Sequence, residues 1–161
     1  MSETTKGRVD IASHVIHASP HTLFAAWLDP HSLMSWLPPH EMDGRLELFD
    51  PREGGPFRMT LTYKSKDHTA PGKSSAHADV VNGRFTRLIP DELIEQAIDF
   101  ESEESAFAGT MTMTWTFEPV AEGTLVTIRC DNVPVGIKAD DHQVGLQASL
   151  RNLAAYTEAL R

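Results

Sequence analysis

Between Ala18 and Pro39 the sequence twice places a capping residue directly before a proline, and this repeated pair constrains the fold more than any other feature. In Ser19-Pro20 and in Asp29-Pro30, the side-chain oxygen can cap a helix, and proline at the first helical position has no N–H to leave unpaired. Pro38-Pro39 stops the second helix after about Trp36. The segment therefore predicts two consecutive short helices.

Most of the remaining chain has the pattern of β-strands. The first strand, residues 8–17, precedes the two helices and is rich in β-branched side chains. Turn residues separate the strands that follow, and we interpret Gly83 as a bulge or kink. An acidic loop is expected at 101–108, and leucines at helical spacing predict one closing helix over 138–160. The six later strands are expected at 44–49, 56–64, 75–88, 92–100, 110–117 and 124–130.

The clearest alternation lies between Thr110 and Phe117. Large apolar side chains occupy every second position, and threonines occupy the positions between them. This period of two is typical of an antiparallel sheet that is covered on one face only. No helical crossover follows a strand before the closing helix, so we expect an α+β fold with an antiparallel sheet.

Composition narrows the function classes. The chain has 161 residues, which suit one domain over 8–161 after a flexible lead-in at 1–7. Lys and Arg number 14 against 23 Asp and Glu, a net charge of −9 that argues against nucleic-acid and anionic-membrane partners. Cys130 is the only cysteine, and no signal peptide or membrane span is evident, so we expect a cytoplasmic protein.

Four motifs, in order along the chain, resemble the family named after the activator of Hsp90 ATPase, in its small bacterial single-domain form. They are ASPHTLFAAWLDPHSLMSW, FDPREGGPFRM, MTMTWTFEPVAEGTLVTI and VGLQASLRNLAAY. This family lies within the START-like (Bet v 1-like) helix-grip domains. In the closing helix Leu146 follows Gly145, where such proteins often have tryptophan. The resemblance implies a curved sheet of about seven strands and a cavity beneath the closing helix. A homodimer is also implied, whereas chaperone activation is not.

The implied cavity places a set of apolar side chains around a small hydrophobic ligand. Three methionines suit a pocket that adapts its shape, because methionine is unbranched and polarizable. The alternative for each residue is an ordinary core position. The expected lining consists of Trp36 at the mouth, Phe57, Met59, Leu61, Met111, Met113, Trp115, His142, Leu146 and Leu150.

Polar candidates are few. His77 and Asp79 lie two apart on a strand and could form an acid–base pair, with Tyr63 as a third candidate; a solvated strand face is the alternative. His142 is expected at the cavity rim, beside acidic residues that the helix dipole explains. We identify no catalytic constellation, no metal-ligand spacing and no cofactor motif. Cys130 is expected to be an inert buried thiol.

Three functions remain open at this point. The first is a non-enzymatic module that binds a hydrophobic or aromatic small molecule. The second is an enzyme resembling polyketide cyclases and aromatases, which orient a substrate in a cavity of this kind. The third is a chaperone-associated or stress-response adaptor that uses Trp36 and Pro38-Pro39 as an exposed patch.

Overall fold

The computed structural model describes residues 7–64 and 78–160. The expected lead-in (except Gly7), the start of the strand expected at 75–88, and His77 therefore lie outside the described residues. The elements, in chain order, are β1 (Arg8–Ile16), α1 (Pro20–Leu28), α2 (Pro30–Trp36), β2 (Met42–Phe49), β3 (Pro56–Tyr63), β4 (Ala78–Ile89), β5 (Leu93–Phe100), the 3₁₀ turn η1 (Ser105–Phe107), β6 (Met111–Val120), β7 (Gly123–Val133) and α3 (Ala139–Glu158).

The two short helices form as predicted. Ser19 accepts a hydrogen bond from the backbone N–H of Thr22 at 3.1 Å, and Pro20 opens α1. Asp29 accepts from the backbone N–H of His31 at 3.2 Å and caps α2 in the same way. Each cap satisfies one of the N–H groups that the first helical turn leaves without a partner.

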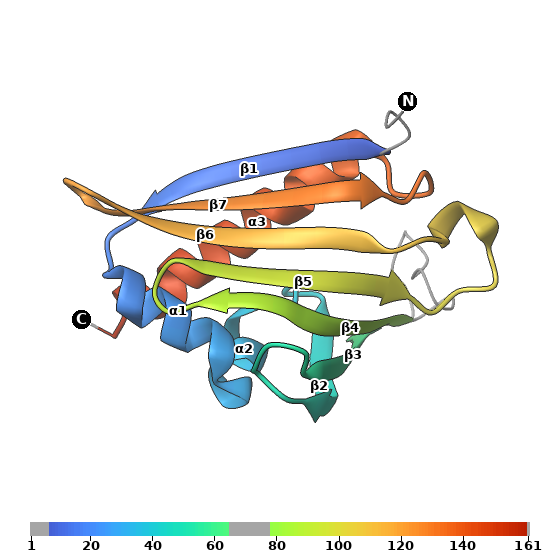
Figure 1. Cartoon of the computed structure of the whole chain (residues 1–161), viewed down its shortest axis with the longest axis horizontal. Helices are drawn as coiled ribbons and strands as arrows, with labels where there is room; N and C mark the ends of the chain where they lie inside the picture. The colour runs from blue at the N-terminus through green and yellow to red at the C-terminus, as the bar shows by residue number, and fades with distance from the viewer. Residues whose placement is uncertain (1–6, 65–77, 161) are drawn as a thin grey trace.

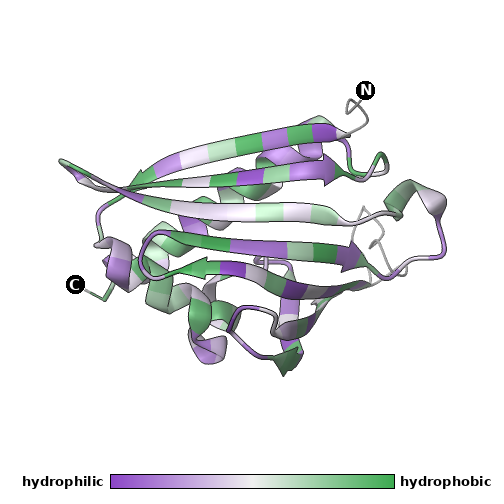
Figure 2. Ribbon diagram, in the orientation of Figure 1, coloured by the Kyte–Doolittle hydropathy of each residue, from purple (hydrophilic) through white to green (hydrophobic). Residues whose placement is uncertain are grey.

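Seven antiparallel strands form one sheet in the order β1-β7-β6-β5-β4-β3-β2, so β1 and β2 are its edges. The strands alternate between hydrophobic and hydrophilic residues along their length (Figure 2). Helix α3 crosses one face of the sheet and packs against β1, while α1 and α2 contact α3 near its C-terminal end (Figure 1). The predicted α+β helix-grip fold with a curved antiparallel sheet is confirmed.

The inward side chains of the central strands form the core. On β6, Met111, Trp115 and Phe117 are buried, while the threonines between them are half-buried on the opposite face. On β7, Val126 and Cys130 are fully buried. The alternation read from the sequence therefore assigns the faces of these strands correctly.

The interpretation of Gly83 as a bulge or kink is wrong. Strand pairing continues through Gly83, which faces Phe57 of β3, and the register shift lies between Phe85 and Arg87. A Cβ atom at position 83 would come within 2.4 Å of the Phe57 ring. Glycine is needed here because an aromatic ring packs directly on the backbone.

Candidate functional site

An apolar cavity of about 230 Å³ lies between the sheet and the helices. Strands β2 to β7 contribute side chains to its wall, and α1, α2 and α3 close it from the other side. A wider hollow of about 430 Å³ lies around His17, Thr22 and Glu122, but mostly polar residues line it. We take the apolar cavity as the candidate site because small-molecule pockets are predominantly apolar with a few polar groups.

Most of the residues expected to line a cavity do so. Trp36 and Leu150 do not; both are buried in the core, with exposed fractions of 2% and 0%. The expected residues that line the cavity are Phe57, Met59, Leu61, Met111, Met113, Trp115, His142 and Leu146. Their role in binding a ligand stays a prediction.

The expectation that Trp36 lies at the cavity mouth, or forms an exposed patch with the prolines after it, is wrong. Its indole N–H donates to the backbone carbonyl of Ala26 at 3.1 Å. Its ring packs edge-on against Trp27 and Trp115, with centroids 5.9 and 5.7 Å apart. This cluster buries Trp36 because edge-to-face aromatic packing adds to the free energy that area burial already provides.

The volume of the cavity limits the size of its occupant. A cavity of roughly 150 Å³ can hold benzene, and pockets for drug-sized ligands begin at about 300 Å³. The volume of about 230 Å³ lies between these values. It suits a compact molecule of one or two rings.

Two cavity-lining strands each carry a buried polar atom without a hydrogen-bond partner. On β5, Gln96 has 1% of its surface exposed, and its Oε1 has no partner among the described residues. On β6, the same is true of the Nε1 of Trp115, and on α1 of the Nε1 of Trp27. Buried polar atoms are nearly always paired, so these three unpaired atoms are unusual features of the residues that line the cavity.

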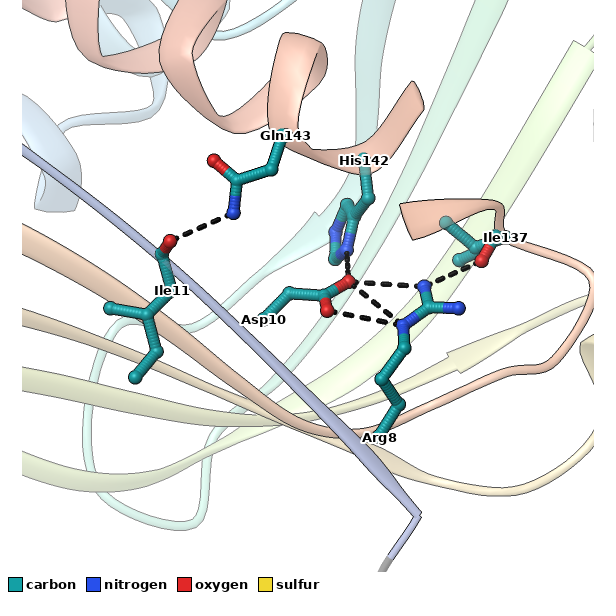
Figure 3. A network of polar contacts seen from close by, with 6 residues as sticks. All are labelled: Arg8, Asp10, Ile11, Ile137, His142 and Gln143. Carbon is teal, nitrogen blue, oxygen red and sulfur yellow. Dashed lines mark hydrogen bonds and ion pairs between the residues drawn. The ribbon is translucent and has the colours of Figure 1, made fainter. Parts of the chain in front are cut away.

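At the start of α3, four charged or polar side chains join the helix to β1 (Figure 3). The Nδ1 of His142 lies 2.6 Å from Oδ2 of Asp10. Arg8 contacts the same carboxylate through Nε and Nη2, at 3.1 and 3.0 Å, and donates to the backbone carbonyl of Ile137. Gln143 donates to the backbone carbonyl of Ile11 at 2.8 Å. These contacts fix the N-terminal turn of α3 over the edge strand.

The Asp10 carboxylate is held in its ionised form. Burial acts to raise its pKa, but the hydrogen bonds and charges of Arg8 and His142 outweigh burial and lower the pKa below its ordinary value. An ionised carboxylate only accepts hydrogen bonds, so Nδ1 of His142 carries the proton between them. The other ring nitrogen, Nε2, is then the one that His142 can present to an occupant of the cavity.

The polar candidates proposed from the sequence are the pair of His77 and Asp79, with Tyr63 as a third. His77 lies outside the described residues. Asp79 is buried, with 7% of its surface exposed, and neither Asp79 nor Tyr63 is among the residues that line the cavity. Burial, followed by the charges of Asp79 and Glu41, raises the pKa of Tyr63. Tyr63 is therefore a neutral phenol at neutral pH.

Gln96, Arg8 and Asp10 were not predicted as site residues from the sequence. Gln96 could have been found, because it interrupts an otherwise apolar alternation between Ile94 and Ile98. The pair of Asp10 and His142 carries no local signal, since 132 positions separate the two residues. Only the packing of α3 against β1 brings them together.

Cys130 lies on β7 with no exposed surface. Burial, aided by the charges of Asp10 and Asp131, raises its pKa to about 12, so the thiol stays protonated and unreactive. Within residues 7–64 and 78–160, no cluster of three His, Cys, Asp or Glu side chains is arranged to hold a metal ion. In the same ranges, no helix has the length and apolar character needed to cross a membrane.

Comparisons with known proteins agree with this architecture. A crystal structure of a protein from Chromobacterium violaceum is 29% identical, covering 93% of this chain and 97% of its own, with a TM-score of 0.80. A Rhodobacter sphaeroides protein is 18% identical over 96% of this chain and all of its own, with a TM-score of 0.76. An AHSA1-like protein from Aeromonas hydrophila is 19% identical over 95% of this chain and 94% of its own, with a TM-score of 0.72.

The low identities of the last two show the shared fold alone. No curated protein matches the sequence. A family model described as activator of Hsp90 ATPase homolog 1-like protein matches residues 17–158, which is most of the chain. The chain therefore belongs to the activator of Hsp90 ATPase homolog 1-like family.

Proposed function

We propose that this protein binds a small apolar or aromatic molecule of one or two rings in the cavity beneath α3. The observation that carries the proposal is the cavity of about 230 Å³ with predominantly apolar walls. Small-molecule sites are typically hollows of this kind, with mostly apolar walls and a few polar groups.

Side chains around the cavity suit an occupant of variable shape. Met59, Met111 and Met113 lie on its wall, and the thioether side chain adjusts to irregular surfaces. The aromatic rings of Phe57 and Trp115 offer faces and edges to a ligand ring. Together they support a ligand that is bound mainly by burial of its apolar surface.

Native mass spectrometry of freshly purified protein tests for a natural occupant. An adduct that disappears on unfolding is expected, and its mass identifies the ligand class. In parallel, isothermal titration calorimetry measures the binding of naphthalene to the ligand-free protein. Naphthalene should bind to the wild type, and failure to bind would contradict the proposal.

A variant with a larger side chain at the cavity tests whether naphthalene binds there. Gly145 lines the cavity, and a Cβ atom there would meet no other atom within 4 Å. Gly145 is exposed, so Gly145→Leu should place a side chain at the open side of the cavity and weaken naphthalene binding by about tenfold or more, since the ligand loses part of its access. Gln147→Leu, on the same helix but outside the cavity lining, is the control and should leave binding unchanged.

An enzymatic function is the second candidate, favoured by the pairing of His142 with Asp10 at the cavity wall. Because Nδ1–H of His142 donates to the Asp10 carboxylate, Nε2 is the ring nitrogen that could act as a base. Nε2 would take a proton from the carbon next to a ligand carbonyl and return one from solvent. Proton NMR in D₂O tests this with 2-tetralone: the wild type should accelerate exchange of its α-protons, and His142→Gln should not.

The sequence also suggests a cytoplasmic location and a homodimer, and both stay predictions. Cell fractionation tests the location. Size-exclusion chromatography with light scattering tests whether the purified chain has the mass of one copy or two.

A further inference from the structure

The strongest polar feature inside the cavity is the side chain of Gln96. Strand pairing places Ile94 opposite Trp115 and Gln96 opposite Met113, so all four residues share the inward face of the sheet. Gln96 is thus the one polar residue on the inward face of β5 within the cavity wall, and its Oε1 has no partner among the described residues. An apolar residue would fill this position without leaving a buried acceptor unpaired.

A hydrogen-bond donor without a partner lies beside this acceptor. Trp115 is the diagonal neighbour of Gln96 on the adjacent strand, a separation that long and aromatic side chains bridge. Its exposed fraction is 1%, and its indole Nε1–H has no partner among the described residues. Both residues line the cavity. The cavity wall therefore contains one unpaired acceptor and one unpaired donor, on residues that are diagonal neighbours of adjacent strands.

We infer that Gln96 and Trp115 form the polar recognition point of the cavity, and that its ligand carries a hydroxyl group on a one- or two-ring apolar body. A hydroxyl group both donates and accepts, so it can donate to Oε1 of Gln96 and accept from Nε1–H of Trp115. An ether or a ketone oxygen only accepts, and a hydrocarbon does neither. This inference rests on the proposed function and specifies the class of ligand.

Three probes of similar size separate these possibilities: 2-naphthol, 2-methoxynaphthalene and naphthalene. Isothermal titration calorimetry should show that the wild type binds 2-naphthol about tenfold more tightly than either of the others, since hydrogen bonds made inside a cavity discriminate strongly. Gln96→Met keeps the length of the side chain but removes the acceptor. This variant should bind all three probes with similar affinity.

Gln147→Met is the matched control, because Gln147 lies on α3 outside the cavity lining. It should keep the wild-type preference for 2-naphthol. An NMR titration of the wild type gives a second readout that needs no stable variant at position 96. The indole N–H resonance of Trp115, assigned with Trp115→Phe, should shift downfield with 2-naphthol and move much less with naphthalene.

Three results would overturn the inference, and they differ in what else they affect. If the wild type binds naphthalene and 2-naphthol equally, the hydroxyl preference is absent while cavity binding stands. If no probe binds, cavity binding of small aromatic molecules fails, and this inference fails with it. A preference for 2-naphthol that persists in Gln96→Met would also overturn the role assigned to Gln96.

Discussion

The two halves of the sheet use the same apolar alternation but pack differently. Beneath the edge formed by β1 and β7, Val126, Cys130 and Leu150 have no exposed surface. Toward the other edge, Leu46 and Met59 on β2 and β3 are only half-buried, and they line the cavity. The first half behaves as a filled core, and the second as a wall around a space.

The position of the helices accounts for this difference. Helix α3 packs against β1 (Figure 1), and its Leu150 and Leu153 have no exposed surface. The cluster of Trp27, Trp36 and Trp115 fills the space under the short helices. Beyond this cluster, residues of β2, β3 and α3 line the cavity. Both halves carry apolar inward side chains, so hydrophobicity alone does not separate core from cavity.

The largest expected effect compares two leucine truncations. Leu150→Ala, in the filled half, should lower the free energy of unfolding by about 2–5 kcal/mol, because it creates a new void in a packed core. Leu46→Ala, in the hollow half, should cost only about 1 kcal/mol, since its side chain already borders empty space. Urea unfolding measures both. Equal losses would contradict the division of the sheet into two halves.

Asp10 lies on β1, at the edge of the filled half of the sheet. Its carboxylate contacts His142, which lines the cavity. Asp10→Asn should lower the free energy of unfolding by about 1.5–3 kcal/mol at neutral pH, the range for hydrogen bonds to charged groups. The pKa of Asp10 is lower in the folded state than its ordinary value of 3.8. Its stabilisation is therefore complete above that value and is lost as pH falls through the lower, folded pKa.

Urea unfolding of the wild type and of Asp10→Asn at about pH 6 and about pH 3 checks this dependence. The gap in stability between the two proteins should narrow at the lower pH. A gap that stays constant would show that the charge of Asp10 does not stabilise the fold. Asp140→Asn, in the exposed first turn of α3, is a control that lacks the contacts of Asp10.

A substitution in the hollow half should raise stability. Gln96→Met removes a buried acceptor that has no partner among the described residues and should increase the free energy of unfolding of the ligand-free protein by about 1 kcal/mol. Differential scanning calorimetry detects this as a higher melting temperature. A destabilised variant would instead indicate that Gln96 is satisfied in solution.

The smallest effect is expected at Gly145, in the interior of α3. Gly145→Ala should stabilise the helix by about 0.5–1 kcal/mol, because alanine loses less conformational freedom and its Cβ meets no other atom within 4 Å. Thermal unfolding followed by circular dichroism measures the change. A loss of stability would mean that the space beside Gly145 is occupied.

Local chemistry made most of the fold predictable. The paired caps and prolines place α1 and α2 to within a residue, and alternation assigns the inward faces of β3 and β6. Helix caps and strand alternation can be recognised because they involve residues that lie close together in the sequence. The 3₁₀ turn within the expected acidic loop was not predicted, because no cap or period marks its three residues.

The cavity could be predicted only in part, because an apolar stripe looks the same whether it lines a core or a hollow. Leu146 and Leu150 lie one helical turn apart, yet only Leu146 lines the cavity. Trp36 was misplaced because its neighbours in the cluster come from α1 and β6. The contact between Asp10 and His142 depends on how α3 packs against β1. No local sequence pattern determines this packing.

The burial of Cys130 turns the single thiol into a natural reporter of core opening. Its side chain lies on the inward face of β7, in the same core as the leucines of α3, so a labelling reagent reaches it only when this packed layer opens. The alkylation rate of the native protein then measures how often the filled half of the sheet opens. A ligand that binds the closed form would slow the labelling, which offers a ligand screen that needs no added fluorophore.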